Sequence, residues 1–198
     1  RAEEWLVFGF LGIILLGTLL LALPVSTRDG HSIGFLDSLF TATSAVCVTG
    51  LVAVDTGTTF SLFGQAVLLV LIQVGGLGFM VFATRVMVML GRRISVKNRL
   101  LIRESMNGAS LSNLGGLARR YLLLALGIEA AGAALLAIRF IPVVGLRRGL
   151  WFAVFHAVSA FCNAGFDLFG SFSSLTGFSA DPLVLLTVAV LIVLGGLG

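Results

Sequence analysis

Residues 43–51 read Thr-Ser-Ala-Val-Cys-Val-Thr-Gly-Leu, and this stretch of small residues lies between two hydrophobic segments. It is typical of a short helix that ends in an extended turn. Residues 159–166, Ser-Ala-Phe-Cys-Asn-Ala-Gly-Phe, follow the same outline. Cys47 and Gly50 each precede their counterparts, Cys162 and Gly165, by 115 residues. The chain therefore contains an internal repeat, and the turns mark it more clearly than the hydrophobic segments do.

The composition is that of a membrane protein. Hydrophobic residues make up 58% of the chain and charged residues 11%, whereas about 25% are charged in an ordinary globular domain. A helix needs about 20 apolar residues to span a bilayer. Stretches that approach or exceed this length are residues 5–23, 60–84, 121–138 and 182–198. Two shorter stretches, residues 33–46 and 149–161, fit helices that enter the membrane and turn back.

These segments predict an all-α integral membrane fold with a channel-like repeat. Each unit contains a span, a short pore helix, a filter loop and a second span. The first unit covers residues 1–90 and the second covers residues 118–198, where it is cut off in its last span. Residues 91–117 are predicted to form a basic linker between the units.

Positive charge is concentrated between the second and third spans. The basic residues there are Arg85, Arg92, Arg93, Lys97, Arg99, Arg103, Arg119 and Arg120. Only Glu104 opposes them, and such loops stay on the cytoplasmic side. We therefore predict a multi-pass protein of the cell (inner) membrane, with the N-terminus and this loop in the cytoplasm and both filter loops outside. Arg147 and Arg148 would lie outside and count against this scheme, but they are outnumbered. The pI near 10.0 thus reflects topology and does not indicate nucleic-acid binding.

The linker carries one further feature. Ser95 is a suitable cap for a basic helix over residues 96–106. Such a helix could lie on anionic lipid or meet a cytosolic partner, and a loop that only sets topology fits equally well.

Glycine recurs in the second span of each unit. Residues 75–78 and 195–198 both read Gly-Gly-Leu-Gly, 120 residues apart. Each glycine costs a helix roughly 1 kcal/mol relative to alanine. We therefore expect close packing against another backbone, in preference to a gating hinge.

The chemistry of the two turns suits a bare cation. A potassium ion that sheds its water needs a ring of backbone carbonyls, and glycine permits the dihedral angles that point carbonyls toward one axis. The C-terminal, partly negative end of each short helix points at the turn. The candidate ion-binding residues are Cys47, Val48, Thr49, Gly50, Cys162, Asn163, Ala164 and Gly165. Asp55 and Asp167 are expected to place negative charge at the outer mouth and raise the local cation concentration.

Other polar residues lie in apolar segments. Glu129 interrupts the third predicted span and is a functional candidate by its depth, but a hydrogen bond to a neighbouring helix or subunit fits equally well. We interpret His156, in the second short helix, as a packed, neutral, hydrogen-bonded imidazole and not as a proton or ion site. Two cysteines are too few for a disulfide framework, and we interpret them as small buried thiols.

The twofold pattern of span, short helix, glycine-bearing turn and span resembles the Trk/Ktr/HKT superfamily of potassium transporters. The turns and residues 73–78, Gln-Val-Gly-Gly-Leu-Gly, carry this resemblance, which is greatest to the membrane subunit of bacterial Ktr or Trk systems. It implies a four-repeat pore with one filter glycine per repeat, a homodimer, and a cytosolic nucleotide-binding regulatory subunit on the basic side. Cys47 stands where such filters often have threonine, and its backbone can still coordinate an ion.

Two repeats cannot surround an ion by themselves. The resemblance therefore implies that this chain is a fragment of a longer subunit, while a genuine half-length protein would need at least two copies. Potassium is the expected ion, with sodium as the alternative, and no cofactor is expected. One alternative is a secondary transporter with inverted repeats around a midplane site. That type would place the two loops on opposite sides of the membrane, whereas the loops predicted here face the same side. A non-conducting scaffold or accessory subunit remains an alternative, whereas an enzyme is not indicated because no paired carboxylates or nucleophile-base set occurs.

Overall fold

The computed structural model describes the backbone of residues 2–90 and 114–197, and the side chains of residues 7–78 and 120–197. Its elements are α1 (Ala2–Leu21), η1 (Pro24–Ser26), α2 (Phe35–Val46), α3 (Thr56–Thr59), α4 (Leu62–Leu90), α6 (Leu114–Val144), α7 (Leu146–Phe161), η4 (Thr176–Phe178) and α8 (Pro182–Leu197). Within these ranges the only strand-like pairing is one isolated bridge between Thr27 and Phe60. The predicted all-α class is confirmed. The predicted helix at 96–106 lies outside the described residues.

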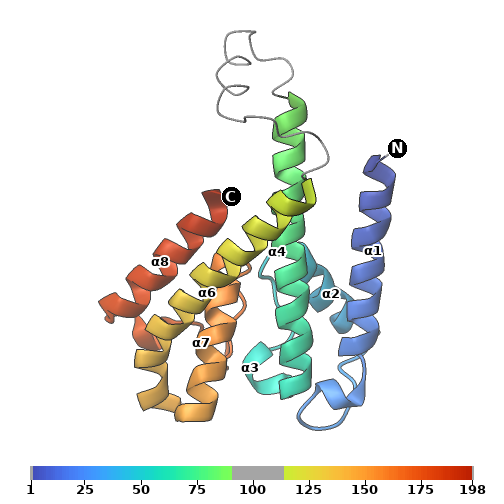
Figure 1. Ribbon diagram of the computed structural model, residues 1–198. Helices are drawn as coiled ribbons and strands as arrows, with labels where there is room; N and C mark the ends of the chain where they lie inside the picture. The colour runs from blue at the N-terminus through green and yellow to red at the C-terminus, as the bar shows by residue number, and fades with distance from the viewer. Residues whose placement is uncertain (1, 91–113, 198) are drawn as a thin grey trace.

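α1 and α6 run in one direction, and the short and long helices that follow each of them run back in the other (Figure 1). α1 begins, α4 ends, α6 begins and α8 ends toward one end of the molecule (Figure 1). The short helices α2 and α7 run back from the opposite end and stop near the middle. They are the two short helices expected from the sequence. Each begins at a glycine with positive φ, 90° at Gly34 and 87° at Gly145, a conformation that glycine adopts without steric cost. Because both short helices start toward the same end of the molecule and stop near its middle, they run in the same sense.

The long helices are apolar on their outer faces. Among the described residues, one helix is long and apolar enough to cross a membrane, over Arg120–Val144, so the third predicted span extends six residues further than expected. The other predicted spans correspond to the shorter apolar segments Val7–Leu21, Leu62–Gly78 and Pro182–Leu197. Side chains that project outward from these helices include Phe8, Leu124 and Leu186. Apolar surface on all sides is typical of helices that lie in lipid.

Two pairs of hydrogen-bonded side chains join the units inside this apolar structure. The indole nitrogen of Trp151 in α7 donates to the Gln65 side-chain oxygen in α4 at 2.8 Å. About two turns further along α4, the Gln73 amide donates to the two carboxylate oxygens of Glu129 in α6 at 3.0 and 3.2 Å. Glu129 is buried and has found a partner on a neighbouring helix, which is one of the two roles considered for it. Such bonds satisfy polar groups that lipid cannot solvate.

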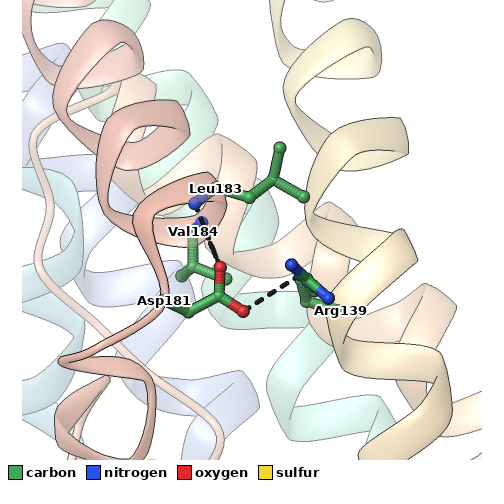
Figure 2. Close-up of polar contacts among 4 residues, drawn as sticks. All are labelled: Arg139, Asp181, Leu183 and Val184. Atoms are coloured by element: carbon green, nitrogen blue, oxygen red, sulfur yellow. Dashed lines mark hydrogen bonds and ion pairs between the residues drawn. The ribbon is translucent and has the colours of Figure 1, made fainter.

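The start of α8 is held against α6 by one carboxylate (Figure 2). Asp181 accepts hydrogen bonds from the backbone amides of Leu183 and Val184, at 3.0 and 3.4 Å, and so caps the helix. Its other oxygen lies 3.0 Å from the Arg139 guanidinium. Because half of the Arg139 side chain is exposed, the pair itself adds little stability. The cap fixes where the last helix begins.

The repeated glycines pack against the ends of the short helices. A Cβ atom on Gly75 of α4 would overlap the carbonyl oxygen of Val46, the last residue of α2. A Cβ atom on Gly195 of α8 would overlap the carbonyl oxygen of Phe161, the last residue of α7. The close packing predicted for these glycines is thus present in both units, and it sets where each short helix ends.

Gly75→Ala is expected to destabilise the protein, because the added methyl group meets backbone that cannot turn aside. Overpacking of this kind typically costs about 1–3 kcal/mol. Gly127→Ala in α6 is the matched control, since a Cβ atom there has no neighbour within 4 Å, and it should be neutral or slightly stabilising. Thermal unfolding of the two full-length variants in detergent measures the difference. Equal stability of both variants would contradict the packing argument.

Candidate ion-binding site

The turns after α2 and α7 are closed by the same backbone hydrogen bonds. In each turn the first residue after the helix and the residue two positions later donate to carbonyls of the last helical turn. These bonds join Cys47 to Thr43, Thr49 to Ser44, Cys162 to Val158, and Ala164 to Ser159, at 2.8, 2.9, 2.9 and 2.7 Å. The backbone therefore leaves α2 and α7 along the same path.

The dihedral angles of the two turns also match. φ is +56° at Val48 and +60° at Asn163, and it is +73° at Gly50 and +76° at Gly165. The residues between them are not among those with positive φ. The two turns therefore share the same pattern of positive φ at matching positions.

The two turns meet at their glycines. A Cβ atom on Gly50 would overlap the carbonyl oxygen of Ala164 and lie 3.4 Å from the Cα atom of Gly165. In the opposite direction, a Cβ atom on Gly165 would lie 3.7 Å from the Cα atom of Gly50. Residues 115 positions apart thus approach through their main chains, and any side chain at Gly50 would separate them.

A cavity of about 350 Å³ lies where the short helices end. Four of the predicted site residues line it, namely Cys47, Val48, Cys162 and Asn163. Its other walls are Gly76 and Leu77 of α4, Tyr121 of α6, Phe161 of α7, and Gly195 and Gly196 of α8. The interpretation of the cysteines as buried thiols was wrong, because Cys47 is exposed and Cys162 is partly exposed in this cavity.

Tyr121 was missed by the sequence analysis. It is the chain's single tyrosine, and its hydroxyl is buried without a hydrogen-bond partner among the described residues. Its place at the start of a predicted span gave no reason to connect it with the turns. Only the packing of α6 beside α4, α7 and α8 brings it to the cavity.

Side chains hold the two turns differently. The Asn163 amide donates to the carbonyls of Phe161 and Ile192, at 3.3 and 3.2 Å, and so connects its turn to α8. Val48 occupies the equivalent position and offers no such bond. A β-branched residue with positive φ is rare and strained. The first turn therefore contains strain that asparagine, which tolerates this conformation, avoids in the second.

Asp55 connects the segments that follow the two turns. Its carboxylate accepts from the amide and hydroxyl of Thr58, both at 2.8 Å, and from the amide of Phe172 at 2.7 Å. Burial opposes ionisation, but these hydrogen bonds outweigh it and hold the pKa of Asp55 below its ordinary value of 3.8. Asp55 is therefore ionised at neutral pH.

Asp167 lies in a different environment. Burial raises its pKa above the ordinary 3.8, and the nearby Asp55 carboxylate raises it further. The amide of Phe169, which donates to Asp167 at 3.1 Å, acts in the opposite direction. The two carboxylates proposed for the outer mouth therefore lie close enough to influence each other.

His156 is a packed imidazole, as the sequence analysis interpreted it. It is 3% exposed, and its Nδ1 lies 2.7 Å from the carbonyl oxygen of Phe152. Its Nε2 lies 3.4 Å from the amide of Leu168. Because a carbonyl only accepts and an amide N–H only donates, these partners require the neutral ring with its proton on Nδ1.

Comparison with known proteins identifies the kind of protein that carries these features. The family model for TrkH, described as a cation transport protein, matches residues 3–198. The chain is 44% identical to the Ktr system potassium uptake protein B of Bacillus subtilis (strain 168), over 98% of this chain and 42% of the relative. It is 43% identical to the potassium/sodium uptake protein NtpJ of Enterococcus hirae, over 96% of this chain and 42% of the relative.

A third relative is the Ktr system potassium uptake protein D of Bacillus subtilis, at 35% identity over 93% of this chain and 41% of that protein. The chain thus spans about two fifths of the length of the relatives it matches. The family and these relatives are transport proteins and not enzymes, in agreement with the sequence analysis.

Exchanging the residues with positive φ tests the strain in the first turn. Val48→Asn is expected to stabilise the full-length protein by about 1–2 kcal/mol, the cost of left-handed backbone for an ordinary residue. Asn163→Val should destabilise it by at least as much, because it also removes two hydrogen bonds. Val25→Asn is the control at an exposed position without positive φ. Thermal unfolding in detergent compares the three, and a Val48→Asn variant no more stable than the control would disprove the strain.

The opposite pKa shifts of the two carboxylates predict opposite effects on stability. Asp55→Ala should cost about 1 kcal/mol at neutral pH, as for a lost helix cap. Because the folded-state pKa is lowered, this contribution is present above pH 3.8 and is lost as the pH falls through the folded pKa. Asp167→Asn should not destabilise at neutral pH, because folding raises that pKa and so disfavours the charged form. Thermal unfolding at neutral and acidic pH measures both, and equal losses for the two variants would refute the assignment.

Proposed function

Because the chain belongs to the TrkH family of cation transport proteins, we propose that it forms part of a potassium-conducting membrane pore. The two glycine-bearing turns contribute two segments of a selectivity filter. The proposal rests above all on one observation, the meeting of Gly50 with Ala164 and Gly165 through their main chains. Backbone carbonyls are the groups that replace the water around a potassium ion.

Three further observations support a filter at this place. The short helices α2 and α7 both end at these turns, so the negative ends of two helix dipoles face the same region. A cavity follows on the side of the turns lined by Cys47 and Cys162, and it offers an ion a path past the turns. Both short helices run in the same sense (Figure 1), which favours parallel repeats over the inverted repeats of the alternative transporter type.

The candidate filter residues act mainly through their carbonyl oxygens. These residues are Cys47, Val48, Thr49 and Gly50 in the first turn, and Cys162, Asn163, Ala164 and Gly165 in the second. Two turns cannot enclose an ion, so the complete pore requires further repeats or further copies of the chain. Asp55 and Asp167 contribute negative charge near the outer ends of the turns, where a cation enters. The hydrogen bonds that keep Asp55 ionised are compatible with this role.

We propose potassium as the principal ion because the relatives named above are potassium uptake proteins. The name of the Enterococcus relative includes sodium as well, and sodium is therefore the second candidate ion. A pore with a glycine filter needs no cofactor.

The proposed orientation follows the charge of the chain. The N-terminus and the basic linker lie in the cytoplasm, and Asp55 and Asp167 lie outside. The ends of α1 and α4 near these cytoplasmic segments lie at the same end of the molecule (Figure 1). We further propose that two complete subunits form a homodimer and that a cytosolic nucleotide-binding subunit meets the basic side. The names of two relatives describe components of a Ktr system, and this is compatible with such a partner.

The test is potassium uptake by a bacterium that lacks its own potassium transport and expresses the full-length gene. Gly50→Ser and Gly165→Ser should each lower growth at low potassium and reduce the preference for potassium over sodium at least severalfold. Serine at either position strains the left-handed backbone, and at Gly50 it also separates the two turns.

Gly30→Ser is the matched control. Its φ is +74°, but a Cβ atom there has no neighbour within 4 Å and it lies away from the turns. It carries the same backbone cost and should keep normal selectivity. No rescue by the wild type, or rescue indifferent to both filter substitutions, would favour a scaffold role or another transported solute.

A further inference from the structure

One residue contacts the second turn on both sides of its glycine. The carbonyl oxygen of Ser159 accepts from the amide of Ala164 at 2.7 Å. The hydroxyl of the same residue donates to the carbonyl oxygen of Phe166, also at 2.7 Å. Ser159, Ala164 and Phe166 are all buried. Gly165 therefore lies between two residues that are both hydrogen-bonded to Ser159.

We propose that Ser159 is a positioning residue for the filter. By binding the residues on both sides of Gly165, Ser159 sets the distance between the second turn and the ion. The proposal rests on the proposed function, since it concerns the selectivity of the same turns. Ser159 does not touch the ion. It acts through the main chain of Ala164 and Phe166, whose conformation determines where the carbonyls next to Gly165 point.

His156 holds the same segment slightly further along. One turn before Ser159 on α7, it accepts a hydrogen bond from the amide of Leu168. Its ring lies among aromatic side chains, with centroid distances of 5.0 Å to Phe169 and 5.5 Å to Phe140. The ring is thus fixed by packing as well as by its bond to Phe152. Residues 166–168 are therefore held to α7 at two points.

The first turn is held in a different way. Ser44 is the counterpart of Ser159, but its hydroxyl accepts from the Thr49 hydroxyl at 2.9 Å, and its carbonyl accepts from the Thr49 amide. Both bonds lie before Gly50. The counterpart of His156 is Thr41, a buried residue whose hydroxyl has no partner among the described residues. The two turns share a backbone path, yet the hydroxyl of the helix serine holds opposite sides of the filter glycine.

This difference has a consequence for ion selection. Sodium is smaller than potassium, so a filter admits it more easily when its carbonyls can move inward. A carbonyl whose neighbours are held on both sides of the glycine moves less than one held on a single side. The second turn should therefore contribute more to the rejection of sodium, through Ser159 and His156.

The experiment measures initial rates of potassium and sodium uptake in cells that express the full-length protein. Ser159→Ala should lower the ratio of potassium to sodium uptake about five- to tenfold, the factor for one lost hydrogen bond of ordinary strength. Ser159→Thr, which keeps the hydroxyl, should restore most of the ratio. Ser44→Ala, the matched change in the first turn, should lower the ratio less.

His156→Phe provides a second, independent variant. It keeps an aromatic ring in the cluster and removes the bond to Leu168, so it should lower the ratio in the same direction as Ser159→Ala. Thr41→Val is its control and should leave the ratio unchanged, because the Thr41 hydroxyl makes no hydrogen bond in the described chain. If one of the two α7 variants fails to reach the membrane, the other still decides the question.

Gly165→Ser, measured in the same cells, separates failure of the positioning role of Ser159 from failure of the proposed filter. If Gly165→Ser changes the ratio while expressed Ser159→Ala or His156→Phe keeps the wild-type ratio, the positioning role is wrong and the filter remains. If Gly165→Ser also keeps the wild-type ratio, the proposed filter itself is wrong. An equal loss for Ser44→Ala and Ser159→Ala would overturn the proposed difference between the turns.

Discussion

The contact between a helix-ending carbonyl and a glycine of the following long helix is the constraint on which the rest of this structure depends. It occurs twice, between Val46 and Gly75 and between Phe161 and Gly195. In both places a side chain would force the short helix away from its neighbour. Because the turn begins directly after this carbonyl, the contact also determines where the turn starts. The repeated glycines of the long helices thus serve the turns and not only the packing of the helices.

Polar groups in this apolar chain are used for specific connections. Gln65 with Trp151 and Gln73 with Glu129 join the two units, and Asp55 joins the segments after the two turns through the amide of Phe172. Each group would be costly in lipid or in an apolar interior without a partner. Since such partners are available only when the units are correctly placed, the same bonds also specify how the units fit together.

The two units have diverged within a common backbone. Their turns share dihedral angles and main-chain hydrogen bonds, so the path of the chain is the same in both. The side chains around that path are different, because Val48 in the first unit corresponds to Asn163 in the second, and Thr41 corresponds to His156. In the proposed pore, such units need not treat an ion equally on all sides. The two turns thus share one backbone shape, while the side chains that hold each turn in place are different.

Local pattern was sufficient for the membrane class, the all-helical fold and the approximate positions of the helices. Hydropathy, glycine and spacing are properties of neighbouring residues, and they report on the conformation of a short segment. Contacts between distant residues carry no such local pattern. The approach of Gly50 to Ala164, the pairing of Gln73 with Glu129, the entry of Tyr121 into the cavity and the exposure of Cys47 therefore appeared only in the folded chain. Each depends on how α4 and α6 bring the two units together, and packing across the whole molecule decides that.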